Sequence, residues 1–191
     1  MNFSSMPYID VIQPEAAEGE LKEIYNGLER SRGKIAEVHK IQSLNPRSIM
    51  NHMDLYMTIM FGKSPLNRLH REMMAVIVSV ANKCEYCQIH HLEAVMSFWK
   101  DEGKTNQLSV NYSKADLSEQ ELALCDYARA LTLTPERSKD AGLIQPLKDL
   151  GFDDRAILDA TLVIAYFNFV NRIVMALGVE VEENPGGYKY E

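Results

Sequence analysis

The chain has 191 residues, of which 46% are hydrophobic, and its formal net charge is −7. This length fits one domain, or two small helical lobes that share a core, and the apolar content is ample for a packed interior. The acidic balance and the lack of any basic run argue against a nucleic acid or an anionic membrane surface as a partner. We therefore expect a globular protein with neither kind of partner.

The cysteine content and the N-terminal sequence both indicate the cellular compartment in which the protein is found. Three cysteines, two of them spaced C-x-x-C, fit a reducing compartment with a redox or metal pair rather than a disulfide scaffold. Residues 1–10 lack the charged and apolar regions of a signal peptide. The longest apolar stretches, residues 73–81 and 161–165, are far shorter than the roughly 20 residues of a membrane span. We expect a cytoplasmic protein without a membrane segment.

Two amphipathic helices are expected in the first third of the chain. The first should begin at Pro14, because proline suits the first helical turn, and end before Gly33. Residues 35–45 are expected to form a loop or a short helical turn. The second helix should run from Pro46 to the residue before Gly62.

Residues 66–101 form the segment around which the rest of the sequence is organised. Asn67 suits the N-cap of a helix. The interior of that helix, residues 74–80, is rich in β-branched side chains and taken alone could form a buried strand. The long apolar run without a period, together with the lack of a partner strand, favours a buried helix. The next helix is expected from about Cys84 to Lys100.

Three further helices are expected after a polar loop at residues 103–112. Ser118 and Glu121 have the spacing of a capping box, which marks the start of the first of these helices. Asp153 suits the N-cap of the last one. The expected ranges are residues 119–133, 139–150 and about 154–178.

The expected elements together predict an all-α fold of about six to seven helices in a single domain that spans residues 1–191. Residues 1–13 show no helical period and are expected to form an extended N-terminal arm. Residues 180–191 are polar, with a proline and paired glycines, and are expected to form a flexible tail.

The helix that begins near Cys84 carries the most informative residues of the sequence. At roughly 100° per residue, Cys84 and Cys87 project within about 60° of each other, and His91 falls between them in angle. Cys87 and His91 are also i,i+4 neighbours. A helix N-terminus stabilises a thiolate, and an imidazole this close can take up a thiol proton. The spacing predicts a redox-active dithiol with a built-in acid/base partner.

Glu72 is the candidate second member of a proton relay. It precedes Cys84 by twelve residues and lies on the preceding helix. If the two helices pack antiparallel, its carboxylate can reach back to the dithiol. Tyr86 and His90 are further relay candidates, although His90 points about 100° away from its neighbour His91 and also suits an exposed or interface position.

The Glu-x11-Cys-x-x-Cys-x-x-x-His motif that begins at Glu72 resembles the core motif of the AhpD-like alkylhydroperoxidases, within the carboxymuconolactone decarboxylase superfamily. The flanking residues 64–66 and 165–172 are similar to those of its peroxidase-related branch. The resemblance covers most of the chain, about residues 8–180.

The resemblance implies an AhpD-like helical bundle that assembles as a homo-oligomer, a trimer or a hexamer. It also implies an alkylhydroperoxidase-like peroxidase, an oxidoreductase that reduces a small-molecule hydroperoxide. An external dithiol or protein reductant would recycle it, with no bound cofactor or metal. Cys87 is implied as the attacking thiol and Cys84 as the resolving one. Some members carry a histidine just before the second cysteine, where this chain has Tyr86.

Other interpretations of these residues stay open. Cys84 and Cys87 could pack as small hydrophobes, as we expect of Cys125, or bind zinc together with His91 and Glu72. One helical turn makes a poor tetrahedral cage, however, and no second ligand pair is evident. The alternative functions are a non-enzymatic redox-sensing or assembly protein and a lactone decarboxylase-like enzyme. The C-x-x-C pair argues against the decarboxylase.

Overall fold

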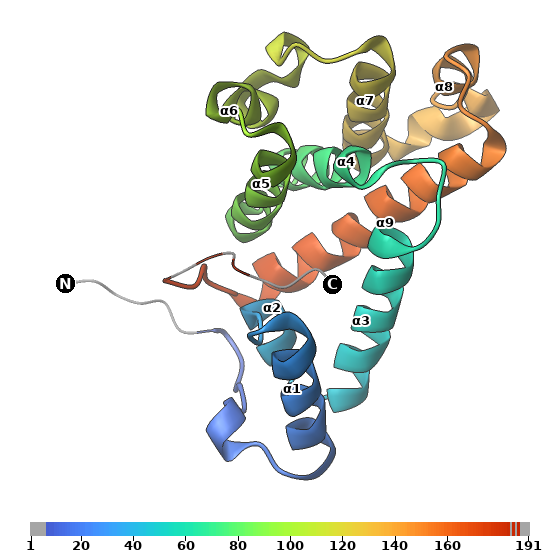
Figure 1. The fold of residues 1–191 in the computed structure, drawn as a ribbon. Helices are drawn as coiled ribbons and strands as arrows, with labels where there is room; N and C mark the ends of the chain where they lie inside the picture. Colours follow the sequence, from blue (N-terminus) through green and yellow to red (C-terminus); the bar gives the residue numbers. More distant parts are fainter. Residues whose placement is uncertain (1–6, 184, 186, 188–191) are drawn as a thin grey trace. The chain divides into compact units, whose positions relative to one another are not determined.

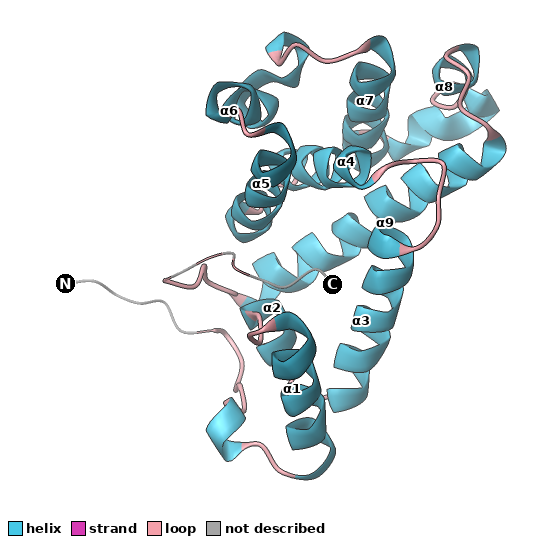
Figure 2. Ribbon diagram, viewed as in Figure 1, coloured by secondary structure: helices cyan, strands magenta, loops and turns pink. Residues whose placement is uncertain are grey.

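The computed structural model describes residues 7–183, 185 and 187, apart from the side chain of Asp140, and their regular structure is entirely helical (Figure 2). The expected arm and tail therefore lie partly outside the described residues. Figure 1 shows the elements along the chain. The α-helices are α1 (Gly19–Arg32), α2 (Glu37–Lys40), α3 (Pro46–Phe61), α4 (Arg68–Ala81), α5 (Glu85–Trp99), α6 (Glu102–Asn111), α7 (Glu119–Leu133), α8 (Gln145–Asp149) and α9 (Asp154–Leu177). The 3₁₀ helices are η1 (Pro14–Ala16), η2 (Tyr112–Lys114) and η3 (Pro135–Ala141).

The chain divides into two compact units. The first comprises residues 1–57 and 172–191, and the second comprises residues 58–171. Helices α3 and α9 each contribute residues to both. The core of the first unit is formed by α1, its preceding turn and α3, through Ala17, Leu21, Ile24, Tyr25, Leu28, Ile49 and Met53.

The second unit is organised around α4, which packs against α5, α6 and α7. Every side chain from Met73 to Val78 is at most 2% exposed. This confirms the expected buried helix, and Asn67 caps it by accepting a hydrogen bond from the backbone N–H of His70 at 2.8 Å. A short turn then reverses the chain, so that α5 folds back along α4.

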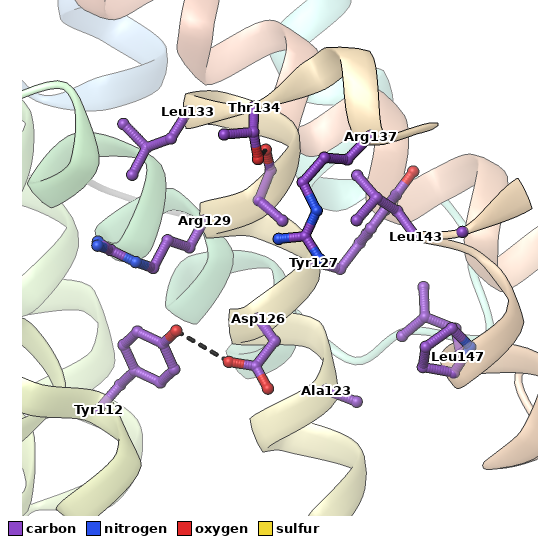
Figure 3. Close-up of a pocket in the computed structure, with 13 residues that line it drawn as sticks. Tyr112, Ala123, Asp126, Tyr127, Arg129, Leu133, Thr134, Arg137, Leu143 and Leu147 are labelled. Atoms are coloured by element: carbon purple, nitrogen blue, oxygen red, sulfur yellow. Dashed lines mark hydrogen bonds between the residues drawn. The ribbon is translucent and has the colours of Figure 1, made fainter. Parts of the chain in front are cut away.

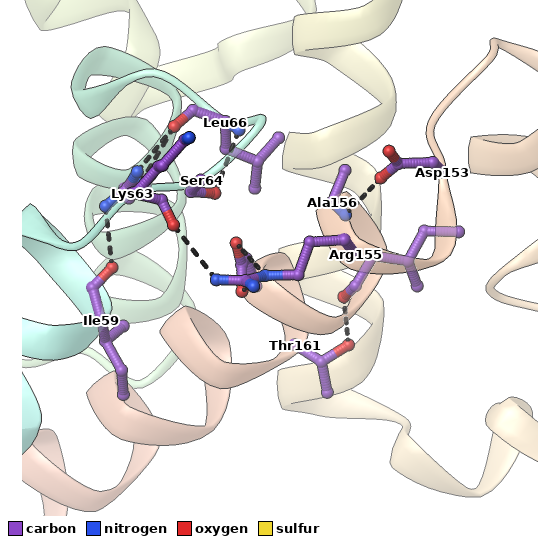
Figure 4. Close-up of polar contacts among 11 residues, drawn as sticks. Ile59, Lys63, Ser64, Leu66, Asp153, Arg155, Ala156 and Thr161 are labelled. Atoms are coloured by element: carbon purple, nitrogen blue, oxygen red, sulfur yellow. Dashed lines mark hydrogen bonds and ion pairs between the residues drawn. The ribbon is translucent and has the colours of Figure 1, made fainter.

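The loop between α3 and α4 is fixed by two arginines (Figure 4). Arg71, which is 5% exposed, donates to the backbone oxygens of Leu66 and Ile59 at 2.8 and 3.0 Å. Arg155 on α9 donates to the backbone oxygen of Lys63 at 3.1 Å. These bonds satisfy one carbonyl group in the last turn of α3, that of Ile59, and two in the loop that follows, those of Lys63 and Leu66. The start of α4 is thereby held in place.

Helix α9 is long and apolar enough to span a membrane by length and composition. Its inner face in the second unit is packed, since Ala160, Val163, Ile164 and Phe167 are at most 1% exposed. Asn171 on the same helix is fully buried and hydrogen-bonded. A helix in the core of a protein is equally rich in apolar residues, because neighbouring helices enclose it.

Three expectations about the elements were wrong. Residues 103–112 are not a loop, because Asp101 caps α6 by accepting from the backbone N–H of Lys104. The helix expected at Pro14 begins only at Gly19, after the separate 3₁₀ turn η1. With α2 and α6 included, the described residues hold nine α-helices rather than six or seven.

Candidate active site

The turn between α4 and α5 sets the position of the two cysteines. Lys83 adopts a left-handed backbone conformation with φ of 61°, and the next residue, Cys84, takes the N-cap position of α5. The backbone N–H of Cys84 donates to the backbone oxygen of Ser79 at 2.9 Å. Cys87 then lies in the first turn of α5. The C-x-x-C pair therefore opens a helix, as its spacing predicted.

The two sulfurs are in contact. Cys84 Sγ and Cys87 Sγ are 2.6 Å apart and hydrogen-bonded, both cysteines are free, and they are only 1% and 3% exposed. The hydrogen bond between them lowers the pKa of Cys84, with help from the backbone N–H of Cys87 and against the effect of burial. The same bond, together with burial, raises the pKa of Cys87.

Glu72 is a buried carboxylate that reaches the histidine of α5. It is 1% exposed, and its Oε2 accepts from Nδ1 of His91 at 2.6 Å. Burial alone would raise the pKa of Glu72, but His91 and then Arg68 outweigh it, and the pKa lies below its usual value. Because the ionised carboxylate accepts from Nδ1, the ring nitrogen left to exchange a proton is Nε2. The ring of His91 also packs edge-on against Phe167, with centroids 4.4 Å apart.

Arg68 is the first residue of the site that the sequence analysis missed. Its Nε donates to Glu72 Oε1 at 2.7 Å, and the two side chains form an ion pair within α4. The guanidinium also lies over the ring of Phe61, with its carbon 3.6 Å from the centroid. The i,i+4 spacing of Arg68 and Glu72 on one helix was the signal that could have revealed it.

A chain of three amides, of which Asn171 is fully buried and the other two partly buried, is the second missed feature. Asn82, at the end of α4, donates to Oδ1 of both Asn168 and Asn171 on α9, each at 3.0 Å. Asn171 in turn donates to Oγ of Ser79 at 3.3 Å. Asparagines within the apolar sequence of α9 were the available signal, because buried amides need partners.

The structure brings the four main predicted residues together on the α4–α5 hairpin. Cys84 contacts Cys87, and Glu72 contacts His91 rather than the sulfurs, to which the sequence analysis had directed it. Their catalytic roles stay predictions. The two further candidates, Tyr86 and His90, contact each other through rings 4.4 Å apart, and Tyr86 is 6% exposed. Cys125 is fully buried on α7, as expected of a core residue.

A cavity of about 540 Å³ lies elsewhere in the second unit, lined by α7, η3, α8 and Tyr112 (Figure 3). The hydroxyl of Tyr112 donates to Asp126 at 2.9 Å, and burial, together with this bond, raises the pKa of Tyr112 to about 12. The lining includes neither sulfur of the dithiol and neither member of the Glu72–His91 pair. The candidate active site is therefore the α4–α5 hairpin and not this cavity. Within the described part of the chain, no three His, Cys, Asp or Glu side chains are grouped to hold a metal ion.

These features define a class of all-helical proteins in which a helical hairpin presents a C-x-x-C dithiol beside a buried Glu–His pair. The model of the carboxymuconolactone decarboxylase family matches residues 49–130. The crystal structure of an uncharacterized peroxidase-related protein from Silicibacter sp. TM1040 is similar at 28% identity with a TM-score of 0.80, covering 96% of this chain and 93% of that one. Residues 49–130 are therefore similar to the carboxymuconolactone decarboxylase family, and the chain as a whole has the fold of this peroxidase-related structure.

Two further solved structures share the fold at lower identity. One is the alkylhydroperoxidase AhpD core of an uncharacterized peroxidase-related protein from Ralstonia eutropha JMP134, with 22% identity, a TM-score of 0.82 and 93% of each chain covered. The other is the debrominase Bmp8, with 20% identity, a TM-score of 0.75, and 94% of this chain and 93% of that chain covered. The same helical fold therefore occurs both in an uncharacterized peroxidase-related protein and in a debrominase.

Proposed function

We propose that the chain is a thiol-dependent, peroxidase-like enzyme that reduces hydroperoxides through a dithiol–disulfide cycle of Cys84 and Cys87. The observation that carries the proposal is the contact of two free sulfurs 2.6 Å apart at the start of α5. The Glu72–His91 pair lies on the same hairpin. The family supports a peroxidase-related or antioxidant protein with a small hydroperoxide as its substrate.

The proposed cycle has three balanced steps. The thiolate of Cys87, the attacking residue by family resemblance, attacks an oxygen of the hydroperoxide; the O–O bond breaks, an alcohol leaves and Cys87 becomes a sulfenic acid. The sulfur of Cys84 then attacks the sulfenic sulfur, the S–O bond breaks, and water and a disulfide form. An external dithiol reduces that disulfide and is itself oxidised.

The polar residues of the hairpin serve proton transfer in this proposal. His91 is one helical turn beyond Cys87, so its Nε2 can take the thiol proton and return it to the departing alkoxide. Glu72 holds the ring through Nδ1 and stabilises the imidazolium that forms. Arg68 keeps that carboxylate charged through its ion pair. No step requires a bound cofactor.

A redox sensor is the second candidate, and the burial of the sulfurs favours it. Exposures of 1% and 3% leave little of either sulfur open to an attacking molecule. A sensor would oxidise once, slowly, and change its assembly, whereas an enzyme would turn over many times.

The deciding experiment is the rate of sulfenate and disulfide formation with hydrogen peroxide and with an organic hydroperoxide. We expect fast oxidation in the wild type, loss in Cys87→Ser, a trapped sulfenate in Cys84→Ser and slower oxidation in His91→Ala. Cys125→Ser is the matched control, since this buried cysteine lies on α7 outside the site. Oxidation no faster than that of a free thiol in every protein would overturn the peroxidase proposal. A single slow oxidation with a change in oligomer size would favour the sensor.

A further inference from the structure

The turn that joins α4 to α5 ends one helix and also delivers the first cysteine of the pair. The backbone N–H of Cys84 donates to the backbone oxygen of Ser79 at 2.9 Å, and that of Lys83 donates to Val80 at 3.0 Å. With Lys83 in the left-handed conformation, these two bonds form a Schellman motif. Cys84 is both the last residue of this motif and the N-cap of α5. Movement of the turn would therefore move its sulfur relative to that of Cys87.

Two side chains of this turn are hydrogen-bonded to α9. Asn82, the residue after α4, donates to Oδ1 of Asn168 and to Oδ1 of Asn171, each at 3.0 Å. Ser79 is fully buried in the last turn of α4, and its Oγ accepts from Asn171 at 3.3 Å. The Schellman motif is therefore attached to α9 at two points.

The amide of Asn168 has one orientation that satisfies all its partners. Thr132 donates its hydroxyl proton to the backbone oxygen of Ala128 at 2.7 Å, so Oγ1 of Thr132 accepts from Asn168 at 3.1 Å. The second hydrogen of the Asn168 amide goes to the backbone oxygen of Ile164 at 3.0 Å. Both hydrogens are then used, and the Oδ1 that faces Asn82 acts only as an acceptor.

The amide of Asn171 is oriented in the same way. Ser79 donates its hydroxyl proton to the backbone oxygen of Ala75 at 2.7 Å, so its Oγ accepts from the NH₂ group of Asn171. The Oδ1 of Asn171 then faces Asn82 as an acceptor. Asn82 must therefore donate both hydrogens of its amide, one to each of two oxygens that cannot donate in return.

We propose that Asn82 is a positioning residue that holds the turn in place through this double donation, keeps Cys84 against Cys87, and so favours closure of their disulfide. The inference rests on the proposed function, because disulfide closure is the second step of that cycle. The two free sulfurs are 2.6 Å apart. A turn held at this position raises the effective concentration of one thiol at the other, and a turn released from α9 lowers it.

The test is the equilibrium between the protein dithiol and oxidised dithiothreitol. The two protein thiols close to a disulfide, and the reagent takes up their two electrons and two protons. We expect Asn82→Asp to lower the equilibrium constant for closure about tenfold, which raises the reduction potential by about 30 mV. The side chain keeps nearly the same volume, but a carboxylate cannot donate and would face two acceptor oxygens. Asn82→Ala removes both donors without adding charge; it should shift the equilibrium in the same direction, and it replaces the aspartate variant if that does not fold.

Tyr127→Phe is the matched control. The hydroxyl of Tyr127 on α7 shares a hydrogen bond of 2.7 Å with Thr161 on α9, so its loss weakens the packing of α9 without touching the turn. We expect this variant to unfold at a lower urea concentration than the wild type and to keep the wild-type equilibrium constant. An unchanged or higher constant in the Asn82 variants, or an equal fall in Tyr127→Phe, would overturn the proposal. Because the equilibrium involves no hydroperoxide, failure of the peroxidase assay leaves this result standing, and failure here leaves that assay unaffected.

Discussion

Glu72 has a hydrogen-bonding partner on each of its oxygens, and this explains how a carboxylate persists at 1% exposure. His91 binds one oxygen and Arg68 the other, and together they offset the cost of removing the charge from water. The same contacts hold the imidazole in one tautomer. A single buried residue thus links the stability of the hairpin to the proton chemistry of the site.

The pH dependence of folding follows from the pKa of Glu72. Its folded pKa is lower than its ordinary value of 4.5, so its contribution to stability is present above pH 4.5 and is lost as the pH falls through the folded value. Glu72→Gln should cost about 3 kcal/mol at neutral pH, because it leaves the guanidinium of Arg68 without its counter-charge and the Nδ1–H of His91 without a charged acceptor. The variant should also lose part of the wild type's acid sensitivity.

Urea denaturation between pH 7 and pH 3 measures both effects. Glu85→Gln, at an exposed position in the first turn of α5, is the control and should follow the wild type. A Glu72→Gln variant with wild-type stability at neutral pH and an unchanged acid limb would contradict the role given to the ion pair.

Residues of the site were predictable where they share one helix with a recognisable motif. The C-x-x-C spacing and the i,i+4 histidine fix the angles of Cys84, Cys87 and His91 on α5. Asn171 was not predictable from the sequence, because its partners Ser79 and Asn82 lie about 90 residues earlier, on α4 and at its C-terminal end. Only the packing of α9 against the hairpin brings them together.

At the scale of elements, the turn between α4 and α5 is the feature on which the site depends. It contains Lys83 in a left-handed conformation that side chains other than glycine adopt at a cost. The same turn places Cys84 at the N-cap of α5 and brings its backbone N–H to Ser79. Strain is therefore held next to the dithiol.

Replacing Lys83 with glycine should stabilise the protein. Glycine adopts positive φ without the clash of a Cβ atom, and we expect a gain of about 0.5–1 kcal/mol, or roughly 1–4 °C in Tm for a chain of this size. Lys83→Ala is the control, because it removes the same charge but keeps the Cβ. Thermal unfolding followed by circular dichroism compares the two, and equal Tm values would show that the turn stores no such strain.

The elements that the sequence predicted well are those with strong boundary residues. Asn67, the Ser118–Glu121 capping box and Asp153 each mark a helix start that the structure confirms. Helix α6 was missed because only Thr105 and Leu108 of its residues are buried, which leaves little hydrophobic periodicity to detect. The stability of a weakly amphipathic helix comes from its packing against neighbouring helices, and its own sequence pattern contributes little.

At the scale of the molecule, α9 presents an apolar stripe to solvent on the side opposite its packed face. Leu158, Leu162 and Phe169 are 53%, 41% and 48% exposed, and their spacing places them within about 40° of one another around the helix. An apolar row of this kind on a core helix is typical of a protein interface. It agrees with the expected homo-oligomer, which remains a prediction.

Leu162→Asp should therefore reduce the molar mass of the protein in solution. A charge in the middle of an apolar interface would lose its hydration on assembly without gaining a partner, so the oligomer should dissociate while the monomer keeps its fold. Size-exclusion chromatography with light scattering measures the mass, and circular dichroism checks the helix content. Leu133→Asp, at a 48% exposed position at the end of α7, is the control and should leave the mass unchanged.

The same measurement under reducing and oxidising conditions separates the two candidate functions. If oxidation of the dithiol leaves the mass unchanged, assembly and chemistry are independent, as expected of an enzyme in which the oligomer only supports the fold. If oxidation and Leu162→Asp shift the mass in the same way, the disulfide acts on the α9 stripe and the sensor gains support. A wild-type protein that is monomeric in both states would exclude the predicted trimer or hexamer and leave the stripe without the partner we assign to it.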